Sequence, residues 1–185
     1  MEAATRAPAP GRLRLVEAFV NTNDVESHRD TLATPEGLSG FLTAAGLLEP
    51  GAPVSDLDQA RAIAVREALR ALLLHNNGAP VAPEAADVLS EVAARSGLRP
   101  RFDAGGSSRL EPSVAGVDAA LGRIVAVVHA AMADGSWPRL KACLAESCQW
   151  AFYDHSKNRS GKWCTMAVCG SRSKVRAYRA RRRAA

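Results

Sequence analysis

Residues 143–172 read CLAESCQWAFYDHSKNRSGKWCTMAVCGSR, and this stretch contains all four cysteines of the 185-residue chain. Cys143 and Cys148 form one C-x4-C pair, Cys164 and Cys169 form a second, and fifteen residues separate the pairs. Two short cysteine pairs separated by about 12 to 20 residues are typical of a closed, tetrahedral zinc site. We therefore predict one structural Zn²⁺ held by these four thiolates, with no coordination position left for a catalytic water.

The same stretch also allows interpretations other than a four-cysteine zinc site. Two disulfides would need an oxidising compartment, but the first residues show no apolar export segment, so we expect a cytoplasmic protein with reduced thiols. His155 lies between the pairs as a further candidate ligand, although four thiolates already complete the site. The aromatic residues of the segment can stack on bases or form a small core, and the core is the favoured interpretation. They are Trp150, Phe152, Tyr153 and Trp163.

Charge is distributed unevenly along the chain. Residues 139–185 carry twelve Lys and Arg residues against two acidic ones, whereas the rest of the chain carries twelve against seventeen. Several of the basic residues after Cys169 recur at spacings of three and four, which places them on one stripe of a helix. Like charges so close repel each other unless an anion is present, and this indicates the phosphate of a nucleic acid; DNA is favoured only by the family resemblance given below. RNA, an acidic protein and simple solubility are the alternatives. The predicted nucleic-acid-binding residues are Arg172, Lys174, Arg176, Arg179, Arg181, Arg182 and Arg183.

The rest of the chain has the patterning of a mainly α protein. Apolar residues make up 47% of the sequence and aromatic residues only 5%, which favours helices packed through small side chains. No run of 18 apolar residues is present, so we expect no membrane span. Helices are predicted over residues 12–23, 34–45, 55–76, 83–97 and 113–134, with a small β-hairpin between 98 and 112. We divide the chain into a flexible leader (1–11), a helical body (12–136) and a zinc finger of hairpin and basic helix (137–185).

The helical body contains no arrangement of residues that predicts catalysis. No nucleophile and base can be paired, and Gly105-Gly106 lacks the strand and helix that would make it a phosphate loop. The most suggestive polar residues are Asn21, Thr22 and Arg66, because a buried Asn beside an Arg can bind a small acid. They are the predicted effector-binding residues, and the alternative is helix capping for Asn21 or Thr22 and a surface charge for Arg66.

Two parts of the sequence resemble known families. The cysteine pairs, the intervening FYDHSKNR at 152–159 and the basic helix that follows resemble the CGNR zinc finger. The name-giving tetrapeptide reads CGSR here, with Ser171 where the family has Asn, and either residue can cap a helix N-terminus. FVNT at 19–22, followed by Asp30-x-Leu32 and Pro35, resembles the ABATE domain usually found with that finger.

These resemblances imply a cytoplasmic, stress-responsive transcription regulator that is not an enzyme. In such a protein the finger binds DNA, and the body senses a small-molecule effector or pairs two copies into a homodimer. The remaining alternatives are an RNA binder, a protein-interaction adaptor built on the zinc module, and an enzyme that the finger merely localises.

Overall fold

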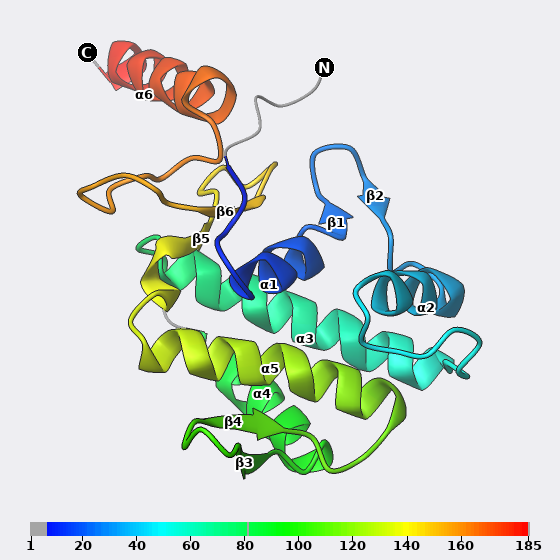
Figure 1. Ribbon diagram of the computed structural model, residues 1–185. Helices are drawn as coiled ribbons and strands as arrows, with labels where there is room; N and C mark the ends of the chain where they lie inside the picture. The colour runs from blue at the N-terminus through cyan, green and yellow to red at the C-terminus, as the bar shows by residue number, and fades with distance from the viewer. Residues whose placement is uncertain (1–6, 81, 185) are drawn as a thin grey trace.

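The computed structural model describes residues 7–80 and 82–184, and helices make up about half of it (Figure 1). Two long helices, α3 (Asp56–His75) and α5 (Gly116–Ala133), run side by side through the middle of the molecule. Around them lie α1 (Leu13–Val20), α2 (Pro35–Ala44) beside α3, and α4 (Pro83–Arg95), which contacts both long helices. The predicted mainly α fold with small hairpins is confirmed.

The strands form three separate two-stranded antiparallel hairpins. They are β1 (Asn23–Asp24) with β2 (Arg29–Asp30), β3 (Arg99–Phe102) with β4 (Ser108–Glu111), and β5 (Leu140–Ala142) with β6 (Ala151–Tyr153). The second hairpin lies where the sequence predicted one, and the third belongs to the finger. The first was not predicted, because two polar residues per strand give no apolar alternation to recognise.

Local side-chain signals explain where the main helices begin. The Thr34 hydroxyl accepts a hydrogen bond from the Gly37 amide at 3.2 Å, and Pro35 occupies the first helical position of α2. At the start of α3, Ser55 and Asp58 each accept a bond from the other's backbone amide, at 3.2 and 2.9 Å. The first helix is shorter than predicted and ends at Val20, because the chain turns there toward β1.

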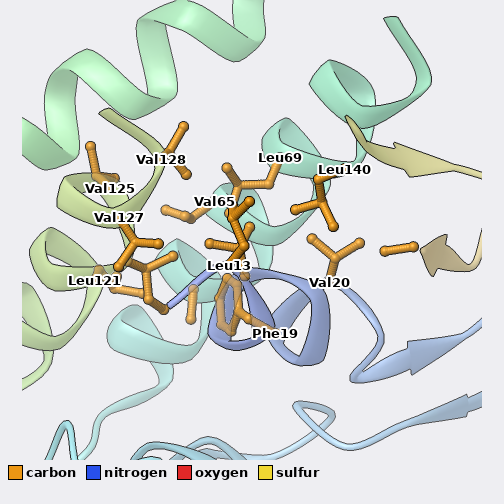
Figure 2. Packing of buried hydrophobic residues seen from close by; sticks show 14 of the residues in the cluster. Leu13, Phe19, Val20, Val65, Leu69, Leu121, Val125, Val127, Val128 and Leu140 are labelled. Atoms are coloured by element: carbon orange, nitrogen blue, oxygen red, sulfur yellow. The ribbon is translucent and has the colours of Figure 1, made fainter. Parts of the chain in front are cut away.

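The hydrophobic core joins the finger hairpin to the helical body. Figure 2 shows Leu140 of β5 beside Leu69 of α3 and Val20 of α1. Side chains alternate between the two faces of a strand, so β6 turns Ala151 and Tyr153 toward this core and Phe152 toward the cysteines. The body and the finger hairpin therefore share one hydrophobic core and are not two separately packed units.

The end of the predicted leader is part of the fold. Ala9 is buried in the main core, and its amide donates a hydrogen bond to the Glu17 carboxylate at 2.7 Å. The carbonyl of Ala7 contacts the ring Nε2 of His155 at 3.1 Å. Residues 7–11 are thus anchored where the sequence suggested a flexible leader, and the leader's residues 1–6 lie outside the described residues.

Helix α5 is apolar enough to resemble a membrane span. Its mean hydropathy is 1.4 over 18 residues, and in the described part of the chain it alone meets the length and composition expected of a span. Ten of its residues are nevertheless buried, and it packs against α1, α3 and α4. Its apolar character is that of a central core helix.

Candidate metal centre and basic helix

The four predicted ligands lie together in one cluster. The Sγ atoms of Cys143, Cys148, Cys164 and Cys169 all lie within 4.8 Å of one another. Cys164 Sγ is 3.6 Å from the sulfurs of both Cys148 and Cys169, and no two of the four form a disulfide. Zinc–sulfur bonds of about 2.3 Å in a tetrahedron place the sulfurs about 3.8 Å apart. The donor set therefore fits a four-thiolate zinc finger.

Tight turns aim each cysteine pair at this centre. In the first turn, the Cys143 amide donates to the Trp150 carbonyl at 3.0 Å and the Cys148 amide donates to the Ala145 carbonyl at 2.8 Å. Gln149 then takes a left-handed φ of 51°, which returns the chain into β6. Phe152 is buried against Cys143 and Cys148, and Trp163 packs partly against the same cluster. The predicted aromatic core is only partly formed, because Tyr153 packs in the main core and Trp150 is exposed.

The second turn is a short π-helical segment, η2 (Met166–Gly170), which leads directly into α6 (Ser171–Ala184). Thr165, not Ser171, caps it: the Thr165 hydroxyl accepts from the Val168 amide at 3.3 Å. The Ser171 hydroxyl instead donates to the Met166 carbonyl at 3.1 Å, so the capping role expected of Ser171 is not observed. A Cβ on Gly170 would lie 2.8 Å from the sulfur of the exposed Met166 side chain, so a larger residue here would require that side chain to move.

Without a cation, the closeness of the four sulfurs favours one thiolate and disfavours ionisation of the neighbouring thiols. Hydrogen bonds from the thiols of Cys148 and Cys164 lower the pKa of Cys143 to about 2. The bonds to Cys143 raise the pKa of Cys148 to about 12 and raise the pKa of Cys164 as well. A first thiolate forms readily, but further thiolates are opposed by the first. A divalent cation at the centre of the cluster would remove this opposition.

Amide side chains from the body hold both cysteine-bearing segments. The Asn77 amide, just beyond α3, donates to the carbonyls of Ala142 at 2.8 Å and Lys162 at 2.9 Å, each within two residues of a ligand. Its neighbour Asn76 donates to the carbonyls of Trp137 and Leu140. The metal centre is therefore assembled partly by a residue of the body.

We expect Asn77→Ala to lower the free energy of unfolding by about 1–3 kcal/mol and to weaken zinc binding, because two buried carbonyls lose their donor. Urea denaturation and competition with a chromogenic chelator would measure the two effects. Asn158→Ala, at an exposed position of the finger, is the matched control. Equal stability and zinc affinity in the two variants would show that Asn77 does not organise the centre.

The predicted effector-binding residues all have partners within the fold. The Asn21 amide donates to the Ala151 carbonyl at 3.0 Å and accepts from the Ala151 amide at 2.7 Å, which pairs it with strand β6. The Thr22 hydroxyl donates to the Phe19 carbonyl at 2.7 Å. The contacts of Asn21 place it at the junction between body and finger, whereas the Thr22 hydroxyl bonds back to the end of α1. Effector binding by both residues stays a prediction.

Arg66 is buried and anchors the β1–β2 hairpin. Its guanidinium binds both carboxylate oxygens of Asp30, at 2.6 and 2.9 Å, and its Nε donates to Glu67 at 2.8 Å. Glu67 also accepts from Arg70, whose other nitrogens reach the carbonyls of Val20 and Gln149. These bonds keep the pKa of Asp30 below its usual value against the effect of its burial. The alternative interpretation of Arg66 as a surface charge is therefore wrong, because its side chain is buried.

A buried ion pair lies within the finger, between Lys141 and Asp154. The Lys141 ammonium and the Asp154 carboxylate lie 2.8 Å apart, and the two side chains are 5% and 0% exposed. Burial disfavours the Asp154 carboxylate, but bonds from Lys141 and from the Ser156 and Gly161 amides outweigh it and hold its pKa below the usual range. Sequence reasoning missed this pair because twelve residues separate its members and no periodicity links them.

The basic helix α6 begins at Ser171, directly after the second cysteine turn ends at Gly170. Arg172, Lys174, Arg179 and Arg182 are exposed on it, and the Arg182 guanidinium lies 6.0 Å from the centre of the Tyr178 ring. The side chains of Arg176, Arg181 and Arg183 lie outside the described residues. Arg172 has a partner that the sequence did not reveal, since its guanidinium donates to Glu26 of the β1–β2 turn at 2.5 Å. That ion pair raises the pKa of Arg172.

Two family models match the chain. The ABATE model, described as “Putative stress-induced transcription regulator”, matches residues 13–136, and the model of the CGNR zinc finger matches residues 139–182. Both resemblances seen in the sequence are confirmed, in the order in which they were predicted. No curated protein matches the chain.

Proposed function

We propose, from the premise that this chain belongs to the ABATE family and ends in a CGNR zinc finger, that it regulates transcription in the cytoplasm by binding DNA through the finger. The observation that carries the proposal is the exposed basic helix that leaves the cysteine cluster directly. One Zn²⁺ bound by the four thiolates would fix the first turn of that helix. The proposal includes no catalytic activity.

The surface of the finger beside α6 suits a phosphate backbone. A groove of about 570 Å³ separates α6 from the first cysteine turn. Ser147 and Ser171 supply hydroxyls to it, Arg172 and Arg179 supply positive charge, and the remaining lining is apolar. Guanidinium groups bind phosphate oxygens in a planar, two-pronged geometry, which supports a nucleic-acid backbone as the ligand; the choice of DNA rests on the family.

Removal of the exposed charges tests the proposal. Lys174→Gln/Arg179→Gln/Arg182→Gln is expected to weaken binding to duplex DNA at least tenfold and to make the slope of log K against log salt shallower by about 3, at about 0.9 per phosphate contact. Fluorescence anisotropy with a labelled duplex would measure both. A triple variant that binds like the wild type would overturn the proposal. A small-molecule effector and a homodimer stay predictions from the resemblance, and no contact among the described residues supports either.

The ion pair between Glu26 and Arg172 leads to a further prediction. A DNA phosphate would compete with the Glu26 carboxylate for the positive charge of Arg172, because Glu26 already accepts a hydrogen bond from one nitrogen of its guanidinium. Glu26→Gln is therefore expected to strengthen DNA binding about two- to fivefold at low salt, the range expected from an exposed ion pair.

Glu49→Gln is the matched control, because Glu49 is also exposed and the variant removes the same charge from the body. Both variants would be compared by anisotropy at one salt concentration. An equal gain in both would mean that only the overall charge of the protein matters and that the Glu26 contact has no specific effect.

A further inference from the structure

A second positively charged element lies on the finger, away from α6. The loop of residues 156–162, which joins β6 to Cys164, exposes the side chains of Lys157, Arg159 and Lys162. None of the three forms an ion pair with any acidic side chain in the described ranges, 7–80 and 82–184. Asp154, which accepts hydrogen bonds from the loop, is already paired with Lys141.

The buried pair of Lys141 and Asp154 forms hydrogen bonds with the backbone of this loop. The Lys141 ammonium donates to the carbonyls of Arg159 at 2.5 Å and Gly161 at 3.2 Å. Asp154 accepts from the amides of Ser156 at 3.1 Å and Gly161 at 2.7 Å. Two buried, charged side chains therefore satisfy the polar backbone of the loop, and its three cationic side chains are left to face solvent.

The conformation of Arg159 shows how tightly the loop is shaped. Its φ of 52° lies in the left-handed region that residues other than glycine rarely adopt. The Lys141 bond to the Arg159 carbonyl keeps the backbone there. A strained residue that surrounding groups hold in place is more often found at a binding surface than in a passive connection.

The loop and α6 are placed to contact one extended ligand. Both lie at the same end of the molecule, at the end opposite to the β3–β4 hairpin (Figure 1). Between the loop and η2, which leads into α6, is a hollow of about 310 Å³. Ser156, Ser160 and Lys162 line it on the loop side, and Trp163 and Met166 line the side toward η2. A backbone bound along α6 can thus continue toward the loop.

We propose that Lys157, Arg159 and Lys162 form a second contact with the phosphate backbone of the DNA duplex that α6 binds. This inference rests on the proposed function. The buried Lys141–Asp154 pair gives the contact its fixed shape, so the loop binds without the ordering cost that a flexible lysine-rich segment would carry. Phosphate contacts of this kind position a protein on the duplex and do not read its sequence.

The test compares Lys157→Gln/Arg159→Gln with Arg99→Gln/Arg101→Gln in the full-length, zinc-loaded protein. Both variants remove two exposed positive charges, but the second pair lies on the β3–β4 hairpin. Binding to a labelled duplex would be followed across a salt series, and zinc content and thermal unfolding would confirm that both variants fold.

The loop variant is expected to weaken binding about tenfold and to make the salt slope shallower by about 2, while the hairpin variant keeps the wild-type slope. Equal slopes in the two variants, with a wild type that binds DNA, would overturn the loop contact alone. A wild type that binds no duplex would overturn the proposed function together with the loop contact. The two failures are therefore distinguishable.

Discussion

Replacement of Cys164 by Ser is expected to release the zinc ion and to unfold the finger. The ion contributes about 10–16 kcal/mol to the folding of small zinc fingers, and a serine hydroxyl does not replace a thiolate. The apolar cluster around the cysteines is small, with only Ala145 and Phe152 buried beside them. Without the metal that cluster cannot hold two turns and a helix with repelling charges in place.

The loss should extend beyond the finger, because β5 and β6 contribute to the core of the body. Leu140 is fully buried there and Tyr153 nearly so, and their exposure removes apolar contacts from α1 and α3. We expect a lowered thermal midpoint for the helical signal in circular dichroism, together with loss of zinc by atomic absorption.

Ala167→Ser is the control for this experiment. It introduces the same hydroxyl at an exposed position of η2 that provides no ligand. The control should keep its zinc and its thermal midpoint. Unchanged zinc content in Cys164→Ser would rule out the four-thiolate centre, and loss of zinc with an unchanged midpoint would rule out the coupling between finger and body.

Replacement of Asp154 by Ala is expected to lower the free energy of unfolding by about 3–5 kcal/mol. Removing one member of a buried ion pair leaves the other charge uncompensated, and Lys141 is only 4% exposed. The variant also leaves the amides of Ser156 and Gly161 without their acceptor. Chemical denaturation of the zinc-loaded protein would measure the effect. Glu146→Ala, at an exposed position of the finger, should change stability by less than about 0.5 kcal/mol.

The dependence on pH gives the same prediction an independent check. Because the pKa of Asp154 is lowered in the folded state, its contribution is fully present above the unfolded value of about 3.9. That contribution is lost as the pH falls through the lower, folded value. The wild type should therefore lose stability below about pH 4 more steeply than Asp154→Ala. Parallel curves for the two proteins would show that Asp154 is not held in its charged form by Lys141.

The parts of the structure that the sequence predicted are those with local or periodic signals. The spacing of the cysteines predicted that the four would lie together, and Thr34, Ser55 and Asp58 marked the helix starts. The helix-start signals depend on residues within one turn of chain and the cysteine signal on a fixed spacing, so no knowledge of the tertiary fold is needed to recognise them.

The junction between body and finger could not be predicted in this way. It is made by side chains that bind backbone groups far away in sequence, such as Asn21 to Ala151 and Asn77 to Lys162. Every residue has the same backbone carbonyl, so the sequence does not indicate which carbonyl a side-chain amide will bind. Asn21 and Thr22 are predicted to bind an effector because a buried Asn beside an Arg can bind a small acid. The sequence did not reveal that Asn21 pairs with strand β6, and effector binding stays a prediction.

Under the proposed function, the zinc-loaded finger binds duplex DNA through phosphate contacts. The most direct test is a salt titration of the zinc-loaded protein against duplex fragments, with metal-stripped protein and duplex RNA alongside. We predict zinc-dependent binding to DNA whose log K falls with a slope of roughly −5 against log salt, as expected for about six phosphate contacts. Binding that is absent, or that is the same without zinc and indifferent to salt, would contradict the account and leave the basic helix as a solvated charged tail.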